Sequence, residues 1–405
     1  MLQRARARLA RQTAAIQARA VWTAQPTAKT SLAGRVKPVA AASHGGDAAS
    51  QLRRVLWEGD AVQMQLLLDA GASPQFRHAN GMTALHVAAH RGDADMVAVL
   101  LARGADPLTR AKDGDTPLHS AMVPSFDGFA DERVRAIEAL LDAGADCKAA
   151  NGAKFTPLIL AVEYGAPLAV LDVLIRKGAS VNAATAGVGM TALLMALINR
   201  PSMCERDVVQ STVERLLAAG ANPRVIGYNG MTPFAMATMV DRPLEVCRAL
   251  IKAGVGLHDT SDNVPQPLNL AVHHDNVALV DMLLDLGADV DRVCKMHKVT
   301  PLMHACRMGV RAEAAALRLL ERGAKVNARC EANAMALHYA LSSFDVRGEA
   351  MTPSLRTVRA LLEHGADVLA VSPLTGRDPK DINKDPEIYA LVHDYVERKR
   401  RKRNK

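Results

Sequence analysis

The chain of 405 residues is half hydrophobic, yet it has few large aromatic rings. Phenylalanine, tyrosine and tryptophan make up 3% of the residues, whereas the hydrophobic types together make up 49%. We therefore expect thin layers of alanine, leucine and valine instead of one thick core. No uninterrupted apolar run reaches the ~18 residues that a membrane-spanning helix requires, so we expect no integral membrane span.

Cysteine pairs and catalytic motifs are also absent from the sequence. The six cysteines, at positions 147, 204, 247, 294, 306 and 330, form no C-x-x-C pair and are too far apart for a zinc site. Reduced, structural thiols are the simplest interpretation. The chain lacks a glycine-rich phosphate loop, a G-x-S-x-G sequence and an H-E-x-x-H sequence. We therefore predict no enzyme activity, metal, cofactor or small-molecule substrate.

A unit of two short helices is clearest over residues 82–107, which read MTALHVAAHRGDADMVAVLLARGADP. Thr83 suits a helix N-cap, and Gly92 suits a left-handed helix end. Asp93 can cap a second helix, which Gly104 then ends. A unit of about 33 residues buries too little surface to be stable alone, so it requires neighbouring units.

The same two-helix pattern recurs along the chain. The first helix returns as TPLHSA, TPLILA, TALLMA, TPFAMA, QPLNLA, TPLMHA and MALHYA, beginning at residues 116, 156, 191, 232, 266, 300 and 335. The second helix ends at a closing glycine in each unit: Gly71, Gly104, Gly144, Gly178, Gly220, Gly254, Gly287, Gly323 and Gly365. An internal period of 33 to 42 residues predicts a solenoid of stacked units.

The repeated motif resembles the ankyrin repeat, which combines a T-P-L-H-x-A helix start with a G-A-D ending. The resemblance covers residues 48–395, with eight full units, a leading half-unit over 48–74 and a degenerate unit beginning at 376. It implies an all-α ankyrin-type solenoid that binds other macromolecules, with projecting turns along one edge. We call each turn after a closing glycine a finger. The resemblance also implies that the motif histidines, His86, His119 and His338, bridge neighbouring turns, whereas His304 stands one position later.

Charge divides the chain into three parts: a basic segment and linker over 1–46, the solenoid over 47–395 and a basic tail over 396–405. Residues 1–46 carry eight Lys or Arg and no acid, and residues 398–405 carry seven and no acid. The remainder has 35 basic and 42 acidic side chains, a net charge of −7. The pI of 9.3 therefore reflects the two ends of the chain.

The first 22 residues form an amphipathic pattern. At 100° per residue, Leu2, Leu9 and Ile16 share one stripe, and arginines cluster on a neighbouring face. An arginine-rich, acid-free amphipathic segment is typical of an organellar transit peptide. We predict a mitochondrial presequence. A disordered basic tail is the alternative interpretation.

The C-terminal sequence ERKRRKRNK has three interpretations. It is a solvated helix end, a nuclear localisation signal, or an arm that binds phosphate groups. A transit peptide at the other end of the chain favours an arm that faces RNA or a membrane. The predicted nucleic-acid or anion contacts are Arg398, Lys399, Arg400, Arg401, Lys402, Arg403 and Lys405.

Insertions between the two helices of three units form one predicted partner surface. They read VPSFDGFADE, NRPSMCERD and SSFDVRGEAMTPS, and equivalent insertions in stacked units gather along one edge. Phe126, Phe129 and Phe344 are the predicted partner-binding residues in these loops. Long surface loops cost little free energy, so insertions without any function would also be tolerated, and this explains them equally well.

The fingers form a second predicted surface for protein partners. Their basic side chains outnumber the acidic ones, which favours an acidic or phosphate-bearing partner, although solubility alone would also favour charged turns. The residues concerned are Arg77, Arg110, Lys112, Lys148, Lys154, Arg224, Arg292, Lys295 and Lys298.

The sequence thus predicts a non-catalytic scaffold, a subunit of a large mitochondrial assembly. An RNA-containing assembly resembling the mitochondrial ribosome is one form of this hypothesis. The alternative is a nuclear or cytosolic adaptor that recruits a client protein and uses its basic C-terminus as an import signal.

Overall fold

The computed structural model describes residues 54–56, 60–78, 80–123, 131–198, 206–227, 230, 232–239, 244–257, 266–294, 299–342, 352–371 and 385–403. Within these ranges the secondary structure is helical, apart from isolated β-bridges between Arg77 and Thr83 and between Ala184 and Thr191. The expected all-α solenoid is confirmed.

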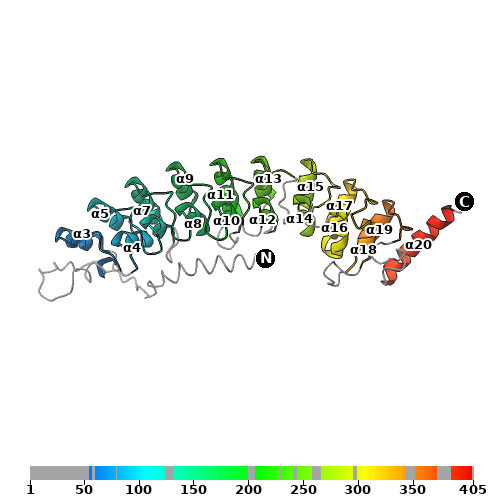
Figure 1. Ribbon diagram of the computed structural model, residues 1–405, viewed down its shortest axis with the longest axis horizontal. Coiled ribbons are helices and arrows are strands. Elements are labelled where there is room, and N and C mark those ends of the chain that lie inside the picture. Colours follow the sequence, from blue (N-terminus) through cyan, green and yellow to red (C-terminus); the bar gives the residue numbers. More distant parts are fainter. Residues whose placement is uncertain are drawn as a thin grey trace.

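Two rows of helices run along an elongated, bowed molecule (Figure 1). The first helices of the units are α4 (Ala84–Arg91), α6 (Pro117–Met122), α8 (Pro157–Glu163), α10 (Ala192–Ile198), α12 (Pro233–Met239), α14 (Pro267–His273), α16 (Pro301–Met308) and α18 (Ala336–Leu341). The second helices are α3 (Ala61–Asp69), α5 (Ala94–Ala102), α7 (Asp131–Asp142), α9 (Leu168–Arg176), α11 (Arg206–Ala218), α13 (Leu244–Lys252), α15 (Val277–Asp285), α17 (Glu313–Glu321) and α19 (Leu355–Glu363). The 3-10 helix η3 (Gly309–Ala312) precedes α17, and α20 (Pro386–Arg403) ends the array.

Helix ends follow the capping residues that the sequence indicates. The carboxylate of Asp93 accepts a hydrogen bond from the backbone N–H of Met96 at 2.8 Å, which caps α5. Gly92 and Gly104 have φ angles of +73° and +77°, in the left-handed region where a residue without Cβ is favoured. These residues keep both helices of the unit short.

The core is a continuous stack of thin layers. Each first helix contributes at least one large apolar side chain that is exposed by 3% or less, and the ones at the equivalent position are Leu85, Leu118, Leu158, Leu193, Phe234, Leu268, Leu302 and Leu337. Burying one such side chain contributes about 1.5–3 kcal/mol. Since successive first helices contact one another along the array, stability comes from neighbouring pairs.

Helix α20 continues across the boundary expected at residue 396. Ile388, Val392 and Val396 recur every four residues, are at most 2% exposed and belong to the common core. The helix has 18 residues and includes the basic run as far as Arg403. The C-terminal end of α20 projects away from the array (Figure 1).

Candidate interaction surfaces

Hydrogen bonds join neighbouring fingers at one fixed position. In four fingers the side chain four residues after the closing glycine donates to the carbonyl oxygen of the next closing glycine. The bonds are Gln75 to Gly104 (3.0 Å), Asn182 to Gly220 (2.9 Å), Arg224 to Gly254 (2.8 Å) and Asn327 to Gly365 (3.0 Å). Arg224, a predicted partner-binding residue, therefore also helps to join two units.

Arg77 and Arg110 link their fingers in a similar way. Nη1 of Arg77 donates to the carbonyl oxygen of Arg110 at 3.1 Å, and Nη1 of Arg110 donates to that of Ala150 at 2.8 Å. Both arginines are nevertheless exposed. Because a guanidinium has five N–H donors, these bonds leave each group able to bind an anion.

The other basic finger residues divide into two sets. Lys112, Lys148, Lys154 and Arg292 are exposed. Lys295 and Lys298 lie outside the described residues. The second and third fingers thus present the exposed bases of Arg110, Lys112, Lys148 and Lys154 on adjacent turns.

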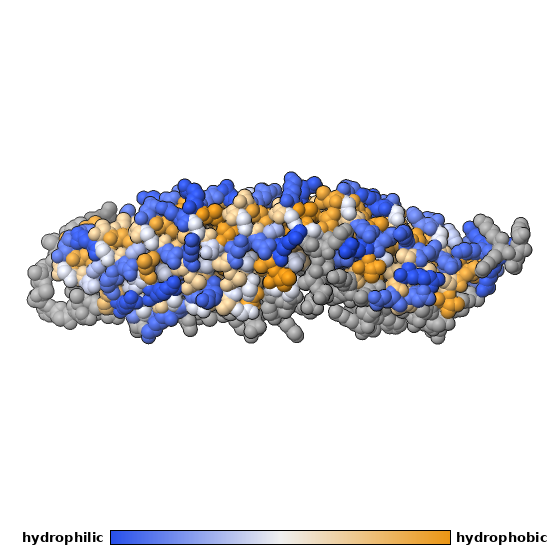
Figure 2. All heavy atoms as spheres, turned by 45° about the horizontal axis from the view of Figure 1, so that its top comes forward, coloured by the Kyte–Doolittle hydropathy of each residue, from blue (hydrophilic) through white to orange (hydrophobic). Residues whose placement is uncertain are grey.

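Several fingers expose apolar side chains that sequence reasoning missed. Ile226, Val293 and Val371 stand six residues after their closing glycines and are exposed by 60%, 43% and 55%. Arg77 and Arg110 occupy the same position in earlier fingers, and Arg329 occupies it between Val293 and Val371. Aligning the fingers by their glycines would have revealed this change in character. The face drawn in Figure 2 shows apolar patches interspersed among hydrophilic residues.

The motif histidines bridge neighbouring units, as the resemblance implied. In His86, Nδ1 accepts from the backbone N–H of Thr83 at 3.1 Å, and Nε2 donates to the carbonyl oxygen of Asp115 at 3.0 Å. His119 makes the equivalent bonds to Thr116 and Phe155, at 3.2 and 3.0 Å. Burial lowers the pKa of both rings to about 4, so both are neutral.

The other two histidines of the motif region differ from each other. His338 makes the same bridge as His86, from the backbone N–H of Met335 to the carbonyl oxygen of Ala370. His304 instead accepts from Nη2 of Arg307 at 3.1 Å. These contacts give the four rings structural roles.

The predicted insertion residues Phe126, Phe129 and Phe344 lie outside the described residues. The helix that follows the first insertion is well anchored, because Arg133 is only 3% exposed. Its Nη1 donates to the carbonyl oxygens of Ala121 and Val123 at 3.2 Å each, at the end of α6. Arg133 therefore holds α7 against the end of α6.

The basic residues at the C-terminus belong to α20, and acids accompany several of them. Arg398 pairs with Asp394 at 2.7 Å, Lys399 with the finger residue Asp367 at 3.3 Å, and Arg400 with Glu397 at 3.8 Å. Arg401 is exposed. Lys402 and Arg403 continue the helix, and Lys405 lies outside the described residues.

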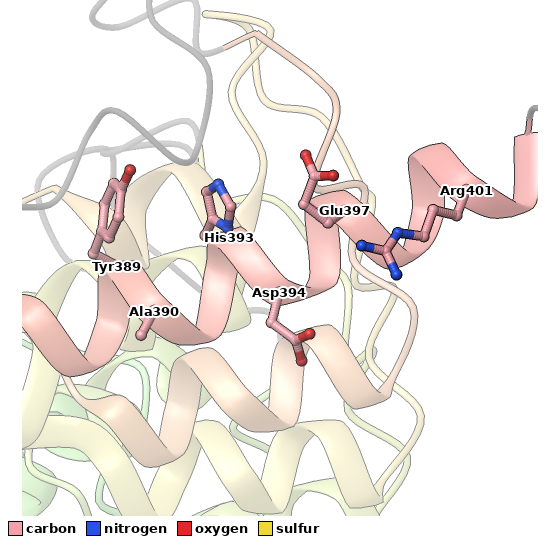
Figure 3. A pocket seen from close by; sticks show the side chains of 6 residues that line it. All are labelled: Tyr389, Ala390, His393, Asp394, Glu397 and Arg401. Carbon is pink, nitrogen blue, oxygen red and sulfur yellow. The ribbon is translucent and has the colours of Figure 1, made fainter.

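A hollow lies along the exposed face of α20 (Figure 3). Its described lining consists of Tyr389, Ala390, His393, Asp394, Glu397 and Arg401. The rings of Tyr389 and His393 lie 5.8 Å apart between centroids and are inclined by 28°. Sequence reasoning missed this group, although the four-residue spacing of Tyr389, His393, Glu397 and Arg401 indicates one helix face.

The described residues contain no cluster of three or more His, Cys, Asp or Glu side chains suited to a metal ion. The cysteines among them are free thiols, and Cys204 lies outside the described residues. No described helix is both long enough and apolar enough to cross a membrane.

Stacked helix pairs joined by hydrogen-bonded fingers define a helical repeat protein. Models of three-copy ankyrin repeats match residues 54–148, 202–294 and 268–372, and a single-repeat model matches residues 154–186. The chain belongs to the ankyrin-repeat family. Ankyrin repeats are in general non-catalytic interaction domains that bind protein partners.

Three relatives share parts of the repeat region. An ankyrin repeat protein of fowlpox virus is 27% identical over 154 residues, which is 37% of this chain and 42% of the relative. Rabankyrin-5 of Mus musculus is 33% identical over 42% of this chain and 14% of its own length. Human ankyrin repeat and SOCS box protein 6 is 36% identical over 26% of this chain and 24% of its own length. The matched parts thus span less than half of each relative.

Proposed function

We propose that this protein is a non-catalytic scaffold whose fingers bind protein partners within a large mitochondrial assembly. The observation that carries the proposal is the hydrogen-bonded row of fingers, which holds exposed side chains in fixed register. The row presents basic side chains such as Arg110 and Lys148 in its early units and apolar side chains such as Ile226 and Val371 in its later units. A rigid row reduces the ordering entropy lost on binding.

The mitochondrial part of the proposal rests on residues 1–46, whose eight bases, absence of acids and amphipathic start suit a presequence. The projecting basic end of α20 supports an RNA-containing assembly, because Lys and Arg side chains contact phosphate groups. The solenoid has a net charge of −7, so on average its electric field repels phosphate groups. The proposed RNA contact therefore involves α20 and not the solenoid.

A nuclear or cytosolic adaptor remains the second candidate. The basic C-terminal run also suits a nuclear import signal. The name of the relative ankyrin repeat and SOCS box protein 6 joins ankyrin repeats to a second part, which is the arrangement expected of an adaptor.

Fusing residues 1–40 to a fluorescent reporter separates the two candidates. We expect mitochondrial fluorescence, and we expect its loss when Arg4, Arg8, Arg11 and Arg19 are replaced by Gln in the matched control. A wild-type fusion that is cytosolic or nuclear would overturn the mitochondrial proposal.

Mass spectrometry of the native complex, purified through the full-length chain, tests the finger surface. Ile226→Asp with Val293→Asp should remove protein partners that the wild type retains. Val62→Asp on α3 is the matched control, because Val62 is 69% exposed but lies outside the fingers. Equal partner sets for the two variants would exclude these apolar fingers as the binding surface.

A further inference from the structure

The exposed face of α20 combines two kinds of side chain that sequence reasoning had kept apart. Ile388, Val392 and Val396 bury one side of the helix. Tyr389 and His393 lie on another side, within the same hollow as Arg401 (Figure 3). At 1.5 Å per residue, Tyr389 and Arg401 are about 18 Å apart along the axis. An aromatic pair and a cationic end therefore share one helix face.

The aromatic pair has the chemistry of a base-stacking surface. Tyr389 is 45% exposed, and the ring of His393 lies beside it at 5.8 Å. Stacking of one nucleobase on an aromatic side chain contributes about 1–3 kcal/mol and tolerates any sequence. Tyr389 is therefore placed to contact a base of a strand whose phosphates, a few nucleotides further along, reach the basic end of the helix.

The charges of the hollow favour a base over a phosphate group. Glu397 lies between the aromatic pair and Arg401 in the lining, whereas Arg398 holds the carboxylate of Asp394 at 2.7 Å. The carboxylate of Glu397 repels phosphate, but it can accept a hydrogen bond from the exocyclic amino group of a base. A polyanion without bases gains nothing from this part of α20. The bases of a duplex are stacked on one another and cannot reach it.

We propose that this hollow binds an unpaired nucleobase of single-stranded RNA while the basic end of α20 holds phosphates a few nucleotides further along the strand. The proposal rests on the RNA contact in the proposed function and names its substrate class. Tyr389 and His393 provide stacking, Glu397 accepts a hydrogen bond from the base, and Arg401 contacts phosphate.

Fluorescence anisotropy with the full-length chain tests this site. The probes are a short mixed-sequence RNA, the same strand paired with its complement, and heparin. Tyr389→Ala should weaken binding of the single strand roughly 5- to 100-fold, with an unchanged salt slope, and should leave duplex and heparin binding unchanged. Tyr389→Phe keeps the ring and should bind like the wild type. Glu387→Ala, two residues away on the same helix, is the matched control.

The outcomes distinguish this inference from the proposed function. If truncation after Glu397 removes the salt slope but Tyr389→Ala binds the single strand like the wild type, the nucleobase site is overturned and the RNA contact stands. Equal weakening of single strand, duplex and heparin by Tyr389→Ala would also overturn the site, because stacking is specific to exposed bases. If the wild type binds no RNA, both proposals fail.

Discussion

The side-chain amide of Gln266 donates a hydrogen bond to the carbonyl oxygen of Val293, 3.2 Å away. In three other units the motif histidine, His86, His119 or His338, makes the link to the next finger. Here Asn269 stands at the histidine position, and both polar atoms of its side chain are buried without a hydrogen-bond partner. The sixth unit therefore keeps its bridge through a different residue and retains an unsatisfied amide.

Asn269→Leu should stabilise the protein, because a buried unsatisfied polar group costs about 1–3 kcal/mol. Leucine already occupies the same motif position as Leu194, which is fully buried. We expect the free energy of unfolding to rise by about 1–2 kcal/mol in urea denaturation. The reciprocal change Leu194→Asn is the control and should destabilise. A loss of stability in Asn269→Leu would contradict the assignment.

The sixth unit should also open before its neighbours. Gln266 provides no side-chain cap for α14, whereas Thr300 accepts from the backbone N–H of Met303 at 3.3 Å and caps α16. A missing cap costs about 1 kcal/mol. Native-state hydrogen exchange should therefore show weaker protection in α14 than in α16. Met335 stands where other units have the capping threonine, yet His338 retains its bridge. The protection of α18 should therefore lie between that of α14 and that of α16. Equal protection of α14 and α16 would refute this order.

Much of the fold could be predicted because each unit depends on local chemistry. Thr156, Asp93 and Gly104 define helix ends through their own side chains and backbone preferences, and the repeat period supplies the neighbours. The bridging role of His86 followed from the family motif. Local signals did not reveal Arg133, whose burial depends on carbonyl groups from another helix.

The candidate surfaces were less predictable because exposure depends on packing between units. Sequence reasoning treated Arg224 as free for partners, whereas its Nε bonds to Gly254. It placed a boundary at residue 396, after a helical stretch over 387–396, whereas α20 continues without a break to Arg403. The presequence and the insertion phenylalanines lie outside the described residues and stay predictions.

Acid should destabilise the protein through His86 and His119. The folded-state pKa of each ring is about 4, below the usual value of 6.5, so the unfolded chain binds protons more readily. This contribution to stability is complete above pH 6.5 and is lost as the pH falls towards 4. Each ring adds up to about 1.4 kcal/mol per pH unit to the slope.

His119→Leu isolates the effect of one ring from the titration of carboxylates. The variant should be less stable than the wild type at pH 7, because the bridge to Phe155 is lost. The difference should shrink as the pH falls from 6.5 to 4.5, measured by urea denaturation at each pH. A constant difference would show that the folded-state pKa of His119 is not lowered.

Replacing glycine with alanine should have unequal effects at the ends of the two helices of one unit. Gly92 and Gly104 have similar left-handed φ angles, so each substitution carries about 1–2 kcal/mol of backbone strain. A Cβ on Gly92 would lie 2.8 Å from Cβ of Arg133, whereas one on Gly104 would meet nothing within 4 Å. Overpacking of this kind adds about 1–3 kcal/mol. Thermal unfolding should therefore rank Gly92→Ala as less stable than Gly104→Ala, and the opposite rank would contradict this packing.

The salt dependence of RNA binding should reflect which basic side chains of α20 form ion pairs with acidic residues. Seven single-strand phosphate contacts would give a log–log salt slope of up to about −5. Arg398, Lys399 and Arg400 each lie beside an acidic side chain. When one of them leaves its carboxylate to bind a phosphate group, fewer counterions are released, because the carboxylate then needs a counterion of its own. We expect a slope nearer −3, from about 0.7 ions for each of the remaining contacts. Asp367→Asn should steepen the slope by about 0.7, because it removes the partner of Lys399 without changing the hollow.

Truncation after Glu397 completes this test, since it removes the basic end and retains Ile388, Val392 and Val396 in the core. Binding of the full-length, Asp367→Asn and truncated chains to one mixed-sequence RNA should be measured across a salt series. Circular dichroism of the truncated chain checks that the array remains folded. If the truncated and full-length chains have the same slope, the basic end of α20 makes no phosphate contacts. The run would then be a helix end, where cations favourably meet the negative end of the helix dipole.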